Sequence, residues 1–236
     1  LKGKEKMIFQ AGYKKKCKVP LVVSVILILG VLLYCKYTNM LIDLWNQING
    51  LTGIAKVDTV KLIVPLGISY YTFSSVGYLL DIYWRKKKYE KSFLNLFVSM
   101  SFFPQMVQGP IAHYPKLIEQ VKNLKGFEYQ RFCMALQLML WGYFKKLVIA
   151  DRIAVFVNQV FNHIGYYRGL VFVLALMASA VQLYADFSGC MDIVEGVAEL
   201  FGITLDKNFD VPFSSKTTAE FWRRWHITLG AWFKDY

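Results

Sequence analysis

The sequence is poor in the patterns that metal centres, nucleotide sites and hydrolase active sites need. Its four cysteines are scattered without CxxC spacing, as expected of small apolar side chains rather than metal ligands. It contains no GxxxxGK[ST] loop, no GxGxxG loop and no GxSxG elbow, so nucleotide hydrolysis and serine-hydrolase chemistry have no support. Histidine is also rare, with three copies. We therefore expect no metal site and have few candidate bases to weigh.

Charged side chains are scarce as well, at 19% of the chain, while hydrophobic residues reach 56%. Soluble domains usually carry roughly 25% charged residues. Four runs of 17 to 21 residues carry no charge, and each is long enough to cross a bilayer. They cover Val19–Cys35, Leu62–Leu80, Ser92–Ala112 and Gly169–Ala185. Four such runs in one short chain predict an integral membrane protein.

The net charge of +12 gathers at the ends of these runs. Lysines crowd residues 1–18, and a second basic cluster occupies residues 85–91. The positive-inside rule places both clusters on the cytoplasmic side, with two crossings between them and anionic lipids as neighbours. We therefore predict a basic cytoplasmic segment over 1–18 and a transmembrane domain over 19–236. Nucleic acid is not an expected partner, because the sequence shows no folded basic face.

Proline and glycine interrupt two of the four runs. Pro65 and Gly67 stand near the start of the second run, and Pro104 and Pro110 lie inside the third. Proline removes a backbone donor, and a broken helix at membrane depth must satisfy its freed polar groups inside the protein. We expect broken or re-entrant segments here. The first run is expected to be a retained span, followed by a polar external loop at 46–60.

The second half of the chain begins with a helical pattern over 127–161. Lys145 and Lys146 interrupt it, so the prediction is one span plus a second, interfacial helix, followed by a short loop at 162–168. The last uncharged run then leads into a more polar stretch. Neither end of the chain looks like a natural terminus, and we expect a piece of a longer polytopic protein.

Three acids follow the last run, at Asp186, Asp192 and Glu195. Paired carboxylates can serve acid–base chemistry or hold a metal ion. The alternative is that they are helix-end charges with an arginine partner such as Arg223. We prefer the alternative, because no histidine lies near them in the sequence to complete a metal site.

The segment Glu220-Phe-Trp-Arg-Arg-Trp-His226 is the strongest polar cluster. A helix capped by Thr217 or Thr218 would place Trp222 and His226 on one face, with the arginines elsewhere and available for an anion. Spacing alone favours an aromatic and basic belt at the membrane interface with a packed histidine. His226 is still the best base, because a neutral imidazole can accept a hydroxyl proton near pH 7.

The other two histidines, His113 and His163, fall in predicted loops. Solvated side chains are the more common outcome at such positions, so neither is a preferred base.

Six motifs occur in order and closely resemble the membrane-bound O-acyltransferase family. They are VPLGISYYTFSSVGYLLDIYW, FFPQMVQGPI, GYFKKLVIAD, LYADFSGCMDI, LFGITLDKNFDVPF and TTAEFWRRWHITLGAWFKDY. The match runs from Lys61 to Tyr236 and is nearest the alginate O-acetylase branch, with the teichoic-acid D-alanyl transfer protein as a relative. The sequence departs from the usual family pattern at FSGCMD, at KNFDVPF and at His113, where an arginine is common. These departures bear on the acceptor and leave the family resemblance intact.

The resemblance implies an all-α, polytopic membrane fold with broken or re-entrant helices around a central tunnel. It implies that His226 is the catalytic histidine and that a second family histidine follows in an LWHG-like motif after residue 236. A chain ending at Tyr236 is expected to be inactive alone. The resemblance also points to seven tunnel-lining, substrate-binding or scaffold positions. These are Asp186, Ser188, Asn208, Trp222, Arg223, Arg224 and Trp225.

The implied reaction moves an acyl group, expected to be acetyl, from a cytoplasmic thioester donor to hydroxyls of a cell-envelope or exopolysaccharide. The donor is a co-substrate such as acetyl-CoA or a carrier-protein thioester, and no bound cofactor is expected. Expected partners are membrane lipids, the glycan acceptor and an acyl carrier protein or an extracytoplasmic acyltransferase. The alternatives are D-alanyl transfer to teichoic acid and a non-catalytic component or transporter for polysaccharide export. The expected location is the plasma membrane.

Overall fold

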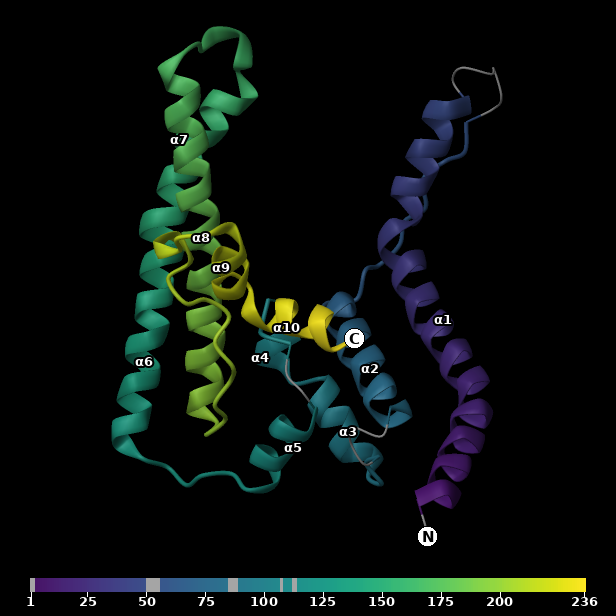
Figure 1. The fold of residues 1–236 in the computed structure, drawn as a ribbon. Coiled ribbons are helices and arrows are strands. Elements are labelled where there is room, and N and C mark those ends of the chain that lie inside the picture. Colours follow the sequence, from purple (N-terminus) through teal and green to yellow (C-terminus); the bar gives the residue numbers. More distant parts are fainter. Residues whose placement is uncertain (1–2, 50–55, 85–88, 107, 112–113) are drawn as a thin grey trace. The chain divides into compact units, whose positions relative to one another are not determined.

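The structure is a computed structural model, and the regular secondary structure in the part of the chain that it describes is helical (Figure 1). The described residues contain no β-strand, and a single antiparallel bridge joins Phe209 to Trp225. The all-α prediction is therefore confirmed. The chain divides into two compact units, Leu1–Ser101 and Phe102–Tyr236, which are described separately below. The described residues are 3–49, 56–84, 89–106, 108–111 and 114–236.

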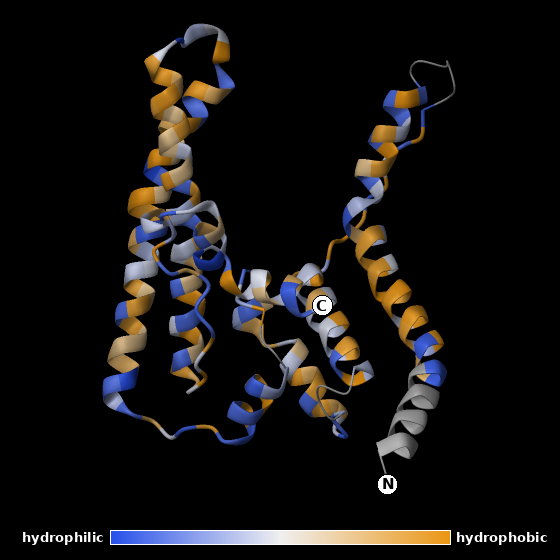
Figure 2. Ribbon diagram, viewed as in Figure 1, coloured by the Kyte–Doolittle hydropathy of each residue, from blue (hydrophilic) through white to orange (hydrophobic). Residues whose placement is uncertain are grey.

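Three helical segments are long and apolar enough to cross a membrane. They are Lys15–Asn49, Tyr129–Asn162 and Leu170–Leu200. Figure 2 shows apolar residues along most of their length. Their number confirms the prediction of a multi-pass membrane protein.

In the first unit, helix α1 (Gly3–Asn49) holds an extended segment along its side. The Asn46 side chain donates to Val57 O and accepts from Val57 N, both at 2.8 Å. Asn39 makes the same pair of bonds with Val60, both at 2.9 Å. Seven residues of helix and three residues of extended chain both advance about 10 Å, so the two amides meet the backbone in register. The predicted loop at 46–60 is therefore wrong over its first residues, where α1 continues to Asn49.

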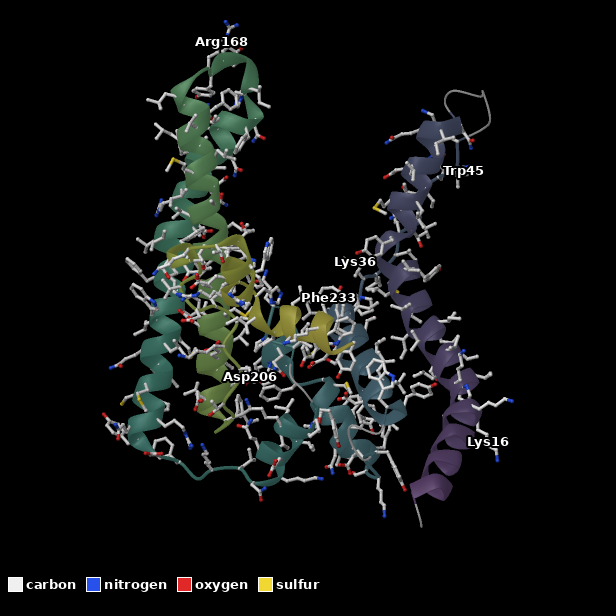
Figure 3. The ribbon with its side chains drawn as sticks, in the orientation of Figure 1. Lys16, Lys36, Trp45, Arg168, Asp206 and Phe233 are labelled. Carbon is white, nitrogen blue, oxygen red and sulfur yellow. The ribbon has the colours of Figure 1, made fainter. Side chains whose placement is uncertain are left out.

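The interrupted apolar runs form short helices. Helix α2 (Ile68–Tyr83) begins after Gly67, whose φ of 77° lies in the left-handed region. Lys36 Nζ of α1 donates to Ser69 Oγ of α2 at 3.2 Å (Figure 3). Helix α3 (Phe93–Met100) ends before Ser101, and α4 (Phe103–Met106) carries Pro104 in its first turn, where a missing N–H costs little. The predicted breaks in both runs are confirmed.

In the second unit, α5 (Tyr114–Lys122) precedes a long helical hairpin. Its first arm joins α6 (Tyr129–Tyr143), the π-helical η1 (Phe144–Ala150) and α7 (Asp151–Asn162) without a break. The prediction of a separate interfacial helix is wrong. Lys145 and Lys146 interrupt the hydropathy pattern, but both find acidic partners on the second arm, so the helix continues through them.

The second arm of the hairpin is α8 (Leu170–Leu200). A short turn, η2 (Ile164–Tyr166), joins the two arms and confirms the predicted loop, and Arg168 lies at that end of the hairpin (Figure 3). The three acids predicted to follow the last span instead lie within α8. Their placement after the span is wrong, because lysines of the first arm compensate Asp192 and Asp186 and the helix continues past them.

The two arms pack backbone against backbone. A methyl group placed on Gly142 would lie 2.6 Å from Gly189 O, and one placed on Gly196 would lie 2.8 Å from Ala135 O. Small residues allow this approach, which is how helices associate in membranes without a hydrophobic driving force between them. The close contact fixes the register of α6 against α8, and with it the charged residues beside Gly142 and Gly189.

Gly142→Ala is therefore expected to destabilise the hairpin by about 1–3 kcal/mol, because the new methyl group must push the two helices apart. Thermal unfolding of the full-length protein in detergent would measure the loss. Gly165→Ala is the matched control, since a methyl group there meets nothing within 4 Å. Equal stability of the two variants would contradict the proposed backbone contact.

After α8 the chain folds back along the hairpin. Ile203 and Leu205 are buried with Ala198 of α8 and Leu117 of α5 in a small apolar core. The chain then passes through η3 (Pro212–Ser214), α9 (Thr218–Arg224) and α10 (Ile227–Asp235). This return brings residues 208–226 against the middle of α8.

Candidate active site around His226

Helix α9 begins where the sequence predicted. Thr217 caps it, accepting a hydrogen bond on Oγ1 from Glu220 N at 3.1 Å. Glu220 in turn accepts from Lys216 N at 2.9 Å and pairs with Arg224 at 2.7 Å. The hydrogen bond from Lys216 N and the charge of Arg224 hold the pKa of Glu220 below its usual value. Thr217 as the cap is confirmed.

The end of α9 differs from the prediction. The helix stops at Arg224, because Trp225 takes up an extended backbone and pairs with Phe209. Asp210 N donates to Arg224 O at 3.0 Å, and Ile227 N donates to Asn208 O at 2.9 Å. The expectation that Trp222 and His226 share a helical face is therefore wrong.

His226 lies at the turn between α9 and α10, with φ 44° and ψ 56°. Its Nδ1 is 3.2 Å from Asn208 Oδ1. The ring of Phe187 meets the imidazole edge to face, with centroids 4.9 Å apart and planes at 85°. The ring is half-buried, and this burial lowers the pKa of His226 below its ordinary value. Burial therefore favours the neutral form of the imidazole.

Asn208 is the hub of this site and is 1% exposed. Its Oδ1 also accepts from Thr228 N at 3.1 Å and from Thr228 Oγ1 at 2.6 Å. Thr228 Oγ1 accepts from Ile111 N at 3.1 Å. We call the four residues Ile111, Thr228, Asn208 and His226 the His226 network. It joins segments from three of the motifs that carry the family resemblance.

Trp225 belongs to a cluster of aromatic rings rather than to an open surface. It stacks on Phe221 with centroids 5.5 Å apart and meets Phe209 edge to face at 5.0 Å. Tyr184 contributes a tilted contact at 6.1 Å, and Phe187 links the cluster to His226. The cluster anchors the chain directly before the catalytic candidate.

Charged residues of the hairpin pair across its two arms. Lys145 Nζ lies 2.5 Å from Asp192 Oδ2 and donates to Ser188 Oγ at 3.3 Å. Lys146 Nζ lies 2.6 Å from Asp186 and 3.1 Å from Asp151. The expected arginine partner is therefore wrong, since lysines of η1 compensate these acids. A π-helix often marks a functional site, and this one presents both lysines to α8.

A groove of about 300 Å³ runs beside this charged region. It reaches Met191, which contacts Asn208, and Phe209, which packs on Phe187. Two side chains in succession, Met191 and Asn208, therefore link the groove to His226. Its charged lining consists of Lys145, Asp192, Glu195, Lys207 and Asp210.

The remaining predicted residues lie outside the His226 network. Trp222 is 61% exposed and packs edge to face on Phe221. Arg223 is exposed, and Arg224 donates to Ser214 Oγ at 3.0 Å in addition to its ion pair. His163 is exposed at the end of α7, as predicted for a loop histidine.

His113 lies outside the described residues. Among the residues that are described, no group of three or more histidine, cysteine or acidic side chains is placed to hold a metal ion.

Sequence reasoning missed Thr228, Phe187 and Ile111. Thr228 follows His226 by two residues, and a hydroxyl so close to a candidate base was the one available signal. Phe187 and Ile111 gave none, because an aromatic ring and a backbone N–H acquire these roles only through the tertiary fold.

The fold and the site together define a class of protein. It is a multi-pass helical membrane protein with a half-buried histidine beside a long helical hairpin. The chain belongs to MBOAT, the membrane-bound O-acyltransferase family, whose model matches residues 85–236.

Three named relatives of the chain are described as acyl-transferring enzymes with different acceptors. A protein named probable alginate O-acetylase from Pseudomonas aeruginosa is 32% identical, over 92% of this chain and 41% of its own length. A peptidoglycan O-acetyltransferase from Helicobacter pylori is 33% identical, over 92% of this chain and 45% of its own. A teichoic acid D-alanyltransferase from Bacillus subtilis is 30% identical, over 75% and 45%. The chain thus spans less than half the length of these relatives.

Proposed function

We propose that the protein containing this chain is a membrane O-acyltransferase in which His226 is the general base. The acyl group, expected to be acetyl, passes from a thioester donor to a hydroxyl of a cell-envelope polysaccharide. The observation that supports this most is the half-buried imidazole of His226, whose Nδ1 is held 3.2 Å from the buried Asn208 amide oxygen. Family membership supplies the reaction class.

The chemistry needs one base and no redox partner. The acceptor O–H gives its proton to His226 as its oxygen bonds to the thioester carbonyl carbon. The C–S bond then breaks, and the thiolate recovers the proton from the imidazolium. An ester and a free thiol are the products, and the histidine returns to its neutral state. A positioned base of this kind contributes about 10²- to 10⁴-fold in rate.

The remaining site residues receive different proposed roles. Asp186 and Ser188 are held by Lys146 and Lys145, which favours a scaffold role for them. Trp225 packs among aromatic rings, which also favours a scaffold. Trp222 and Arg223 are exposed, which leaves them free to meet a substrate or lipid.

The names of the relatives favour a cell-envelope or secreted polymer as the acceptor. We propose O-acetylation of such a polymer, with acetyl-CoA or a carrier-protein thioester as donor. The D-alanyl transferases match a smaller share of the chain than the O-acetylases do, which places teichoic acid second. Transport for polysaccharide export fits the spans alone but gives no role to a neutral histidine held by a buried amide. The topology that accompanies this proposal places residues 1–18 in the cytoplasm.

The pH dependence of kcat/KM is expected to follow the ionisation of His226. A base must be unprotonated, so activity should fall as the pH drops through the pKa of His226. Burial lowers that pKa, and the midpoint is therefore expected below the ordinary histidine value of about 6.5. Rates of acyl transfer by the full-length protein between pH 4.5 and 8 would measure it. A midpoint above 7 would argue against a neutral, buried base.

Mass spectrometry of envelope polymers tests the reaction class and the acceptor together. Deleting the gene is expected to remove one ester-linked acyl group from one polymer, and restoring the full-length gene should return it. The mass of the lost group distinguishes acetyl from D-alanyl. Loss of the polymer from the cell surface, with its acylation intact on the remaining material, would favour export instead.

A further inference from the structure

The orientation of the Asn208 amide follows from a neighbouring group that can only donate a hydrogen bond. The backbone N–H of Thr228 points at the Asn208 side chain from 3.1 Å, and a backbone N–H can only donate. The atom that it faces is therefore the amide oxygen. Rotating the amide by half a turn would set an NH₂ group against this N–H and leave two donors in contact.

The Thr228 hydroxyl agrees with this orientation. It accepts a hydrogen bond from the backbone N–H of Ile111 at 3.1 Å and donates its own proton to Asn208 Oδ1 at 2.6 Å. The backbone N–H of Thr228 thus fixes Oδ1 as an acceptor, while Asn208 Nδ2 contacts the sulfur of Met191 at 3.0 Å.

The same oxygen faces Nδ1 of His226 at 3.2 Å. An unprotonated Nδ1 would set its lone pair against that oxygen, so Nδ1 carries the proton of the neutral ring. Nε2 then keeps the free lone pair. We infer that Asn208 is a positioning residue that selects the Nδ1–H form of His226, so that Nε2 is the atom that takes the proton of the acceptor hydroxyl.

This inference rests on the proposed function only for its last clause. The tautomer itself follows from the hydrogen bonds. Two neutral contacts hold the ring, the Asn208 amide at Nδ1 and Phe187 against the ring plane. The charged residues nearest to His226 and Asn208 along the chain interact with other groups than the imidazole. Arg224 pairs with Glu220, and Lys207 and Asp210 line the neighbouring groove.

Nitrogen NMR of the full-length protein labelled with ¹⁵N-histidine reads the tautomer without any measurement of activity. The signals of His226 are assigned by their loss in His226→Gln. We expect a protonated Nδ1 and an unprotonated Nε2 at pH 8. A ring protonated on Nε2 would overturn the inference, whatever the enzyme does.

Two substitutions at Asn208 then test the positioning role. Asn208→Asp keeps the acceptor oxygen and adds a negative charge beside Nδ1, which raises the pKa of His226. The acid limb of kcat/KM should move to higher pH by roughly one unit or more. Asn208→Leu removes the acceptor and should lower kcat/KM by roughly 100-fold at every pH, mainly through kcat.

Asn123→Asp is the matched control, because Asn123 is exposed and its side chain donates to Glu119 O at 3.1 Å, one turn earlier in the chain. It should leave the pH profile unchanged. An unshifted acid limb in a folded, active Asn208→Asp enzyme would overturn the positioning role. If Asn208→Leu fails to fold, Asn208→Asp and the NMR measurement still decide. Full activity in His226→Ala would instead remove the proposed base and leave the tautomer assignment standing.

Discussion

Replacing His226 with alanine in the full-length protein is expected to reduce acyl transfer by about 10²- to 10⁴-fold, the range that a positioned base contributes. The substitution removes Nε2 and leaves the acceptor hydroxyl without a base. Protein levels in the membrane should change little, because the ring is only half-buried and the backbone bonds of Trp225 and Ile227 remain. The O-acyl content of the envelope polymer in a strain carrying this variant would measure the effect.

His163→Ala is the matched control for this experiment. His163 is exposed and lies at the end of α7, where its Nδ1 is 3.1 Å from Gln159 O. Its loss should leave acylation at the wild-type level. Equal effects of the two substitutions would show that His226 has no special role.

Lys145→Met is expected to destabilise the hairpin by about 3–5 kcal/mol, the cost of leaving a buried charge without its partner. Lys145 and Asp192 have side chains 15% and 18% exposed, and Asp192 would lose its cation within a membrane-spanning segment. The amount of folded protein in membranes and its unfolding temperature in detergent would both fall. The double substitution Lys145→Met with Asp192→Leu should recover most of the loss, since it leaves no charge unpaired.

An exposed ion pair provides the comparison. Lys116 pairs with Asp206, but their side chains are 56% and 38% exposed. Lys116→Met should therefore cost at most about 1 kcal/mol. If Lys145→Met proved no more damaging than Lys116→Met, the pairing across the hairpin would have no structural importance.

The features that depend on local backbone chemistry were predictable from the sequence. Pro65 and Gly67 indicated that the second apolar run would not be one helix, and α2 begins directly after Gly67. Thr217 or Thr218 was predicted as the helix cap, because a threonine side chain can satisfy the first free N–H groups, and Thr217 is the cap. Two of the four long uncharged stretches, Val19–Cys35 and Gly169–Ala185, likewise lie in helices long enough to span, since bilayer thickness sets their length.

The failures share a physical cause, which is that partners distant in the sequence decided the outcome. Lys145 and Lys146 looked like the end of a span, and Asp186 looked like the start of a polar region. Each is instead compensated by the other arm of the hairpin. Hydropathy treats each charge as if it were alone, so it places helix ends where ion pairs in fact continue the helix.

The site shows the same limit. Helical spacing placed His226 beside Trp222, whereas pairing with Phe209 ended α9 before His226 was reached. Spacing alone favoured a packed interfacial histidine, and the motif resemblance was what pointed to His226. Asn208 was proposed as a substrate-binding residue, yet its buried amide bonds to Thr228 and His226. The role proposed for Asn208 depends on contacts between residue 208 and residues 226–228, which spacing along the sequence does not reveal.

The account depends most on the idea that His226 acts as a base on an acceptor hydroxyl. The most direct test is the initial rate of acyl transfer from a labelled thioester to the purified polymer, measured with the full-length protein in lipid vesicles at pH 7.5. The wild-type protein should transfer label to the polymer, while folded His226→Ala should transfer less than about one hundredth as fast. Transfer by that variant at the wild-type rate would contradict the account.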